Sequence, residues 1–179
     1  MGVDGSERRL CEYRCLPLFD EMNNWVADLP TPKFVETISE FYQQAPGDDV
    51  YANNPMNYVK LDRSPHLDDW TPIVDAMRQG HYFVTSGEVL IPTWSVDGTA
   101  TQRTVVADVE WTFPLEMVEI VWGDGRTVGR QVVSARDLPA FSRHQFRIPF
   151  DASGKTWVRF AAWDSAGNGA LVQPVRINP

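Results

Sequence analysis

The sequence predicts a mainly β protein: an immunoglobulin-like antiparallel β-sandwich preceded by a helical segment. Hydrophobic periodicity changes near residue 80 from about 3.6 residues to 2, as expected where helices give way to strands. Seven or eight short apolar segments then follow at the spacing typical of a sandwich. The 179-residue chain is 43% hydrophobic, which is sufficient for a packed core.

Residues 1–80 are the predicted helical segment. Residues 17–29 and 31–44 each carry apolar side chains at helical spacing. The second stretch opens with Thr31, which can cap a helix, and with Pro32 at the first helical position. Its apolar face comprises Phe34, Ile38, Phe41 and Tyr42. Residues 49–62 are expected to be extended.

A third helix is predicted in the stretch SPHLDDWTPIVDAMRQG, which ends at Gly80. Asp68 or Asp69 can accept the free amide protons of its first turn, and Gly80 is the expected left-handed stop. The side chains expected to form its buried stripe are Trp70, Ile73, Val74 and Met77.

Residues 81–179 are the predicted β-sandwich. The expected strands are 81–85, 88–96, 104–113, 115–122, 126–133, 143–150, 155–163 and 169–177. Two of them alternate clearly, which predicts one buried face for each. The face shared in the third strand is Val105, Ala107, Val109, Trp111 and Phe113, and that in the sixth is His144, Phe146, Ile148 and Phe150. Hairpin turns are expected at 123–125 and 164–169.

The polar stretch Thr85, Ser86, Gly87 and Glu88 separates two apolar runs and is the first candidate site. Gly87 can adopt unusual dihedral angles, and Ser86 can bond its own backbone, as at a bend or bulge. Ser86 lacks the Gly-x-Ser-x-Gly context of a nucleophile elbow. We therefore interpret the stretch as a structural junction. A catalytic pair of His81 and Glu88 is a competing hypothesis that lacks an orienting third group.

Metal-dependent hydrolysis requires clustered His, Asp and Glu ligands. The three histidines of the chain belong to no His-x-His, His-Glu-x-x-His or Asp-x-His pair. His66 is interpreted as part of a helix start, and His144 as a histidine at the edge of the core. A calcium loop at Asp164, Ser165 and Asn168 lacks EF-hand spacing, so a hairpin loop is favoured there. No catalytic residue, metal ligand or cofactor is assigned to this chain.

Tryptophan supplies the second candidate site. Trp157 and Trp163 share a strand face with Arg159. Exposed aromatic rings and an arginine could bind a ligand such as a sugar. The other interpretation is that the helical segment docks on this face. Docking is favoured, because the predicted helices must bury their apolar stripes somewhere.

Charge and hydropathy exclude several classes of partner. The formal charge is −8, so a basic nucleic-acid-binding face is not expected. No apolar stretch approaches the roughly 20 residues that cross a bilayer, and the N-terminus lacks the apolar core of a signal peptide. We expect no nucleic-acid or membrane partner, and the compartment stays open. Cys11 and Cys15 are expected to be reduced thiols.

The stretch DDWTPIVDAMRQGHYFVTSGEVLI resembles the junction at the end of the catalytic barrel in PHP-superfamily metallohydrolases of the carbaryl-hydrolase-like branch. In that family, a helix of the form W-x-x-x-x-x-A-[LM]-R-x-G leads into [YF]-[FY]-V-T-[ST]-G. A β-sandwich follows and ends in a strand similar to WVRFAAWDSAGNGALVQPVRI. The resemblance covers roughly residues 49–178.

The resemblance implies a parent enzyme that hydrolyses ester or phosphoester bonds with divalent metals held in His-x-His and Gly-Ser-Asp-x-His-type motifs. This chain has neither motif, so no metal-binding residue is carried over. Residues 1–80 would be the tail of the barrel and residues 81–179 an accessory domain. The expected partners are the missing N-terminal barrel portion or a second copy bound through the helical segment.

Two main functional hypotheses result. The first is a non-catalytic C-terminal accessory module of a metal-dependent (phospho)esterase-type hydrolase, in which residues 85–88 are a junction bend. The second is a stand-alone carbohydrate- or protein-binding β-sandwich that uses Trp157, Arg159 and Trp163. A complete small enzyme with a site at His81 and Glu88 is the third and least supported hypothesis.

Overall fold

The structure is a computed structural model that describes Phe34, residues 56–99 and residues 101–177. Within these residues there are ten strands and one helix, α3 (Thr71–Arg78). The strands are β1 (Met56–Val59), β2 (Tyr82–Thr85), β3 (Val89–Thr99), β4 (Gln102–Trp111), β5 (Leu115–Gly123), β6 (Val128–Ser134), β7 (Ser142–Asp151), β8 (Trp157–Asp164), β9 (Gly169–Val172) and β10 (Val175–Arg176).

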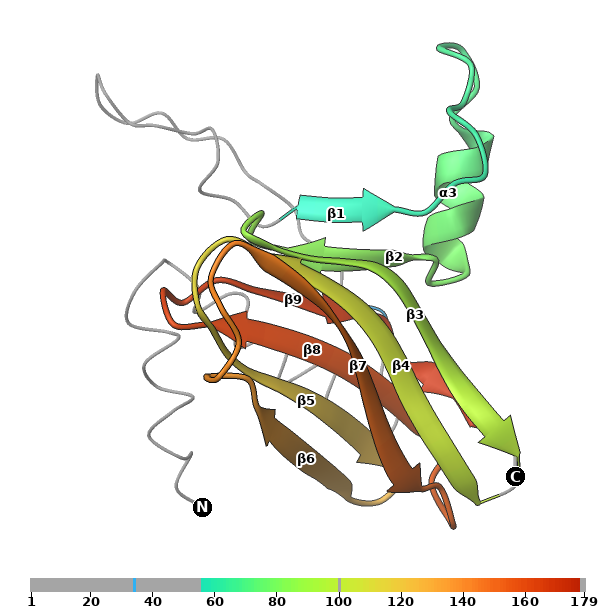
Figure 1. Ribbon diagram of the computed structural model, residues 1–179. Coiled ribbons are helices and arrows are strands. Elements are labelled where there is room, and N and C mark those ends of the chain that lie inside the picture. The colour runs from blue at the N-terminus through green and yellow to red at the C-terminus, as the bar shows by residue number, and fades with distance from the viewer. Residues whose placement is uncertain (1–33, 35–55, 100, 178–179) are drawn as a thin grey trace, which may run out of the picture.

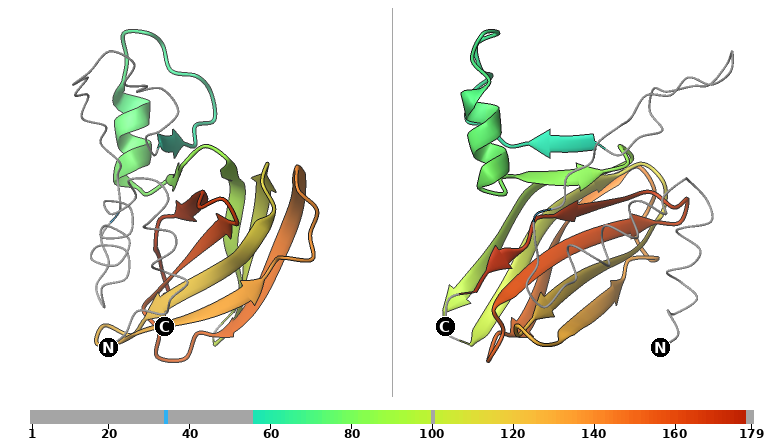
Figure 2. Two further views of the ribbon diagram at one scale, coloured as in Figure 1. Left: turned by 90° about the vertical axis from the view of Figure 1, so that its left-hand side faces the viewer. Right: turned by 180° about the vertical axis from the view of Figure 1, so that it is seen from behind.

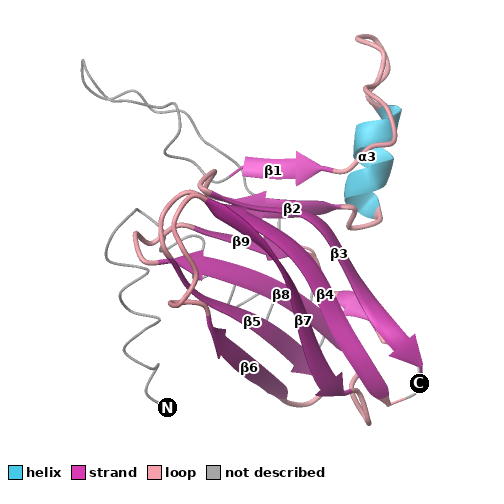
Figure 3. Ribbon diagram, viewed as in Figure 1, coloured by secondary structure: helices cyan, strands magenta, loops and turns pink. Residues whose placement is uncertain are grey.

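The strands form two sheets that face each other (Figures 1 and 3). The larger sheet has the order β1-β2-β9-β8-β5-β6, and β10 also pairs with β8. The smaller sheet has the order β3-β4-β7. All of these pairings are antiparallel. The prediction of a mainly β fold is confirmed, and the two facing antiparallel sheets are consistent with a β-sandwich.

The main core lies between the sheets and follows the predicted alternation. From β4 it takes Val105, Ala107, Val109 and Trp111, and from β7 it takes Phe146, Ile148 and Phe150. The larger sheet supplies Val118, Ile120, Val158, Phe160, Ala162, Ala170 and Val172. The prediction was wrong for Phe113, which is 43% exposed. This residue follows the end of β4, where the pleat no longer directs alternate side chains inward.

Both predicted hairpin turns are present. Between β5 and β6, Asp124 Oδ1 accepts the N–H groups of Arg126 at 2.7 Å and Thr127 at 2.6 Å, and Gly125 has a φ of 89°. Between β8 and β9, the buried Asp164 accepts the N–H of Asn168 at 2.7 Å and its side-chain amide at 2.7 Å. The Asp164 carboxylate therefore shapes the hairpin loop, as the favoured interpretation required.

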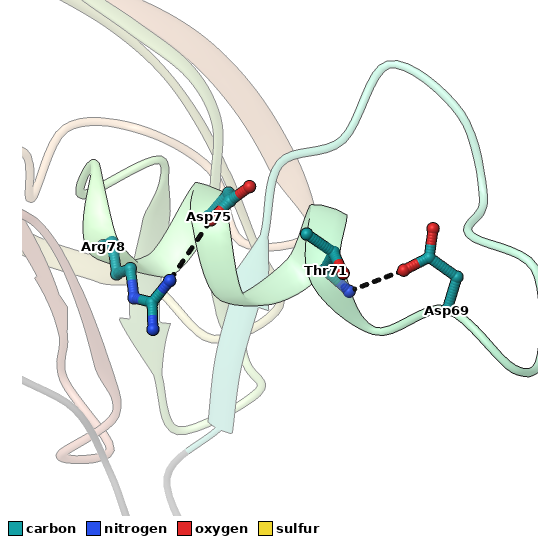
Figure 4. Close-up of polar contacts among 4 residues, drawn as sticks. All are labelled: Asp69, Thr71, Asp75 and Arg78. Carbon is teal, nitrogen blue, oxygen red and sulfur yellow. Dashed lines mark hydrogen bonds and ion pairs between the residues drawn. The ribbon is translucent and has the colours of Figure 1, made fainter.

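The start and stop of α3 agree with the sequence prediction. Asp69 Oδ1 accepts the Thr71 N–H at 3.0 Å, and Arg78 lies 3.5 Å from Asp75 on the exposed side (Figure 4). Hydrogen bonds from Thr71, first through its side chain and then through its backbone, lower the pKa of Asp69. Gly80 has a φ of 74°, the left-handed conformation expected of a helix stop.

The predicted buried stripe of α3 is partly wrong. Trp70 is 66% exposed and Val74 is 41% exposed, whereas Ala76 is buried and Ile73 and Met77 are half-buried. The reason is the position of the helix. It lies at the β1–β2 end of the larger sheet, to one side of the smaller sheet, so that a narrow strip of it contacts the strands (Figure 1).

Several sequence predictions concern residues that the structure does not describe. The helices expected at 17–29 and 31–44 lie outside the described residues, apart from Phe34, and so do Cys11 and Cys15.

β1 belongs to the segment 1–80, which was predicted to be helical with one extended stretch, and it pairs with β2 and so extends the larger sheet. In the described part of the chain there is no helix with the length and apolar character that a membrane crossing requires.

Candidate functional site: the crossover end and the outer face of the larger sheet

Residues 85–88 are the bend by which the chain passes from the larger sheet to the smaller one. β2 ends at Thr85 in the larger sheet, and β3 begins at Val89 in the smaller sheet. Gly87 has a φ of 103°, which a side chain would disfavour. The Thr85 hydroxyl accepts the Gly87 N–H at 2.9 Å and donates to the Val89 carbonyl. Thr85 therefore closes the bend.

Ser86 ties this bend to the β8–β9 hairpin. Its Oγ accepts the Gly169 N–H at 3.0 Å, and its own N–H donates to the Gly169 carbonyl at 3.0 Å. The Asn168 side-chain oxygen lies 3.4 Å from the Ser86 Oγ. We predicted that Ser86 would bond its own backbone; instead Thr85 has that role and Ser86 bonds a segment more than 80 residues away.

Glu88 ties the bend to the next passage between the sheets. Its carboxylate accepts the Thr112 hydroxyl, and its carbonyl accepts the Thr112 N–H at 3.2 Å. Thr112 lies between β4 and β5, and its carbonyl in turn accepts the Phe141 N–H at 3.0 Å. We call this cluster the crossover end: residues 85–89, 112–114, 135–141 and 164–169 (Figure 1).

His81 and Glu88 do not form a site. They flank the four residues of β2, which span about 13 Å at the usual strand rise. The His81 carbonyl accepts the Lys60 N–H at 2.8 Å, and its N–H donates to the Ala76 carbonyl at 2.9 Å. These bonds hold the His81 backbone at the end of β2 opposite the crossover end.

His66 and His81 line an open depression of about 960 Å³ between residues 60–66 and α3. Both side chains are exposed, and His66 lies 3.7 Å from the Asp68 carboxylate. Residues 56–99 and 101–177 contain no group of three or more His, Cys, Asp and Glu side chains placed to hold a metal ion. His144 is exposed and packs edge-on against Phe146 at 4.8 Å, at the margin of the core.

Trp157, Arg159 and Trp163 share the outer face of the larger sheet, which we define as the face turned away from the smaller sheet. All three are buried, with exposed fractions of 2%, 0% and 5%. They therefore do not form the open platform that a stacking sugar would require. Docking of the helical segment on this face requires the three side chains to be buried, whereas binding of a ligand such as a sugar requires accessible rings.

Glu119 of β5 is the residue of this cluster that sequence analysis missed. Its Oε1 accepts the Trp163 indole N–H at 3.3 Å and lies 3.8 Å from Arg159 Nη1. Its Oε2 lies 3.7 Å from Arg130 Nη1. The cluster thus contains one carboxylate and two guanidinium groups, and a buried charge of this kind requires such partners. The sequence signal that could have indicated it is an acidic residue, Glu119, between apolar residues of the predicted strand.

Cross-strand glycines explain how the two tryptophans lie on the sheet. Gly169 is directly opposite Trp163, and Gly123 is directly opposite Trp157. A Cβ on Gly169 would lie 2.0 Å from the Trp163 ring, and one on Gly123 would lie 2.3 Å from the Trp157 ring. Each indole therefore lies down over a glycine of the neighbouring strand. Residue spacing alone could not show this, because it depends on strand pairing.

Comparison of the chain with protein-family models, with curated proteins and with solved structures finds no match.

Proposed function

We propose that this chain is a non-catalytic C-terminal accessory module of a metal-dependent (phospho)esterase-type hydrolase. Its sandwich would be immunoglobulin-like and would follow the tail of a PHP-type barrel. The observation that carries the proposal is the role of Thr85, Ser86, Gly87 and Glu88. Their polar groups bond three other parts of the fold: the start of β3, the β8–β9 hairpin and the passage between β4 and β5.

This arrangement supports a structural role for the residues that carry the family resemblance. A catalytic serine or glutamate needs a polar group directed towards substrate and a partner that orients it. Here the Ser86 and Glu88 oxygens accept hydrogen bonds from Gly169 and Thr112. Under the proposal, the catalytic metals and their ligands belong to the barrel portion that the resemblance implies, and this chain braces that portion.

Hydrolysis assays test the proposal. The purified chain, supplied with Mn²⁺ or Zn²⁺, is expected to hydrolyse neither a phosphodiester nor a carboxylic ester faster than buffer with the same metal. The decisive variants are His66→Ala and His81→Ala, at the two histidines of the open depression. Metal-dependent turnover that disappears in either variant would overturn the proposal.

The alternative function is a stand-alone carbohydrate- or protein-binding β-sandwich. Its carbohydrate form has less support, because Trp157, Arg159 and Trp163 are buried. Its protein-binding form is favoured by Phe113 and Phe141, which are 43% and 82% exposed at the crossover end. Exposed aromatic side chains of this kind are typical of contact surfaces.

Analytical ultracentrifugation separates the two functions for a partner of the same sequence. Under the alternative, the chain associates with itself through the crossover end, and Phe141→Ser abolishes that association. Under the accessory-module proposal, Phe141→Ser leaves the sedimentation of the chain unchanged. The exposed Val132→Ser, on β6, is the matched control for the loss of a surface apolar group.

A further inference from the structure

The larger sheet is buried on both of its faces. Ala161 and Ala162 are neighbours on β8 and point to opposite faces, and both are 0% exposed. Ala162 belongs to the core between the sheets, whereas Ala161 belongs to a second apolar cluster on the outer face. That cluster comprises Tyr82, Val84, Ala161, Trp163 and Leu171. A sheet buried on both faces requires a layer on each side.

The described elements supply one of these two layers. Figure 2 shows the smaller sheet along one side of the larger sheet, and α3 at the β1–β2 end. Met77 of α3 packs against the outer-face cluster there. The centre of the outer face, at β8 and β5, carries Arg159 and Val121, which are both 0% exposed. A guanidinium withdrawn from water in this way needs a cover as well as its partner Glu119.

Phe34 indicates which segment of the chain covers the outer face. It is the one residue before Met56 that the structure describes, and its ring contacts Tyr82 of the outer-face cluster. The ring lies edge-on to Tyr82, with centroids 6.5 Å apart. It also lies so close to Gly80 that a Cβ there would be 2.7 Å from it. Phe34 belongs to the apolar stripe expected in residues 31–44.

We propose that residues 31–44 lie as an amphipathic helix across the outer face of the larger sheet, from β2 towards β5. Phe34 anchors the helix at Tyr82, and Ile38, Phe41 and Tyr42 cover the strands beyond. A helix rises about 1.5 Å per residue, so Tyr42 lies about 12 Å from Phe34 along its axis. β8 is two strands from β2, which is about 10 Å at the usual strand spacing. The stripe is therefore long enough to reach Ala161 and Trp163.

The covering helix suggests a structural role for the buried Glu119–Arg159 pair. A buried ion pair rarely adds stability over apolar side chains of the same size, and in some proteins it instead selects one arrangement of the fold. Under this proposal the pair sets where the helix can lie, since a displaced helix would leave the charges in contact with apolar side chains or water. The inference does not depend on the proposed function.

Cysteine labelling of the full chain tests the proposal. Cys11 and Cys15 are first replaced by serine. Ala161→Cys then reports the outer face, Ala162→Cys reports the core between the sheets, and Ser134→Cys reports an exposed position. A maleimide is expected to label the cysteines of Ala161→Cys and Ala162→Cys slowly, because each becomes accessible only when the fold opens. It should label the cysteine of Ser134→Cys at the rate of a free thiol.

The covering stripe is then perturbed with Ile38→Asp. We expect the outer-face cysteine to be labelled about tenfold faster or more, and the core cysteine to keep its rate. Gln43→Asp is the matched control, because it adds the same charge on the opposite side of the predicted helix and should change neither rate. If Ile38→Asp also exposes the core cysteine, Phe34→Ala replaces it and is judged by the same two rates.

Three results would overturn the proposal. In the first, the outer-face cysteine is labelled as fast as the cysteine at position 134 in the unperturbed chain. In the second, that cysteine stays protected in both Ile38→Asp and Phe34→Ala, which would mean that another segment covers it. In the third, its protection falls on dilution, which would assign the cover to a second copy of the chain.

Discussion

The Glu119 carboxylate lies 3.8 Å from the Arg159 guanidinium, and the two side chains are only 4% and 0% exposed. Glu119→Ala would remove the buried carboxylate that faces the Arg159 guanidinium. We expect Glu119→Ala to lower the free energy of unfolding by about 3–5 kcal/mol. Guanidinium chloride unfolding at neutral pH measures this quantity.

A double replacement separates the charge from the packing. Glu119→Met combined with Arg159→Met removes both charges and keeps most of the side-chain volume. The double variant is expected to be more stable than Glu119→Ala and close to the parent chain. If Glu119→Ala unfolds at the same denaturant concentration as the parent, the pair is not buried as described.

Ser86 joins the sheet-crossing bend to the β8–β9 hairpin through the Gly169 N–H. Ser86→Ala leaves that donor without the serine oxygen, and a buried donor left in this way costs about 1–3 kcal/mol. Ser95→Ala is the control, because Ser95 donates at 2.7 Å to Asp97 on an exposed part of β3. The control should stay within about 0.5 kcal/mol of the parent. Equal losses in the two variants would contradict a special role for Ser86.

Gly169 makes room for the Trp163 ring, which lies 2.0 Å from the position of an added Cβ. Gly169→Ala should therefore overpack this contact and cost about 1–3 kcal/mol. The smaller side chain in Trp163→Leu should relieve the clash, so the double variant should lose less than the sum of the two single losses. Strict additivity in thermal unfolding would show that the ring and the glycine do not interact.

Asp124 should make the stability of the chain depend on pH. Hydrogen bonds from the Thr127 and Arg126 backbones, and then from the Thr127 side chain, lower its pKa from 3.8 to about 2. Because the folded-state pKa is the lower one, the charged carboxylate stabilises the fold above the unfolded pKa of 3.8. That contribution is lost as the pH falls through about 2.

Asp124→Asn isolates this effect. The variant should be less stable than the parent near pH 6, and the difference should shrink between about pH 4 and pH 2. Urea unfolding across this range measures it. A difference that stays constant with pH would mean that the carboxylate is not held by the turn in its charged form.

Local sequence patterns predicted the strands well, because each pattern depends on neighbouring residues. The alternation from Val105 to Trp111 matches β4, and Gly125 and Gly80 have the expected positive φ angles. Phe113 departed from its pattern where the strand ended, and Trp70 where the helix extended beyond the sheets. Val74, in the middle of α3, is exposed as well, because the helix presents only a narrow strip to the strands. These errors all depend on how each element meets the sheets, which is set by the tertiary fold.

Long-range contacts were out of reach of such patterns. Ser86 bonds Gly169, and Trp163 lies over the same glycine, because of strand pairing that no local spacing encodes. Residue spacing along β8 predicts that Arg159 and Trp163 share one face, but it carries no information about Glu119 on the neighbouring strand β5. The sequence therefore predicted that Trp157, Arg159 and Trp163 share a face, but only the structure shows that this face is buried.

Binding of a divalent metal by the chain is the sharpest test of the proposed accessory role, because under that proposal the catalytic metals belong to another part of a hydrolase. The full chain with Cys11→Ser and Cys15→Ser is dialysed against Mn²⁺, and the metal retained by the protein is measured by mass spectrometry. We expect no retained manganese above a protein-free control. One equivalent of manganese that is lost in His66→Ala or His81→Ala would contradict the proposed accessory role.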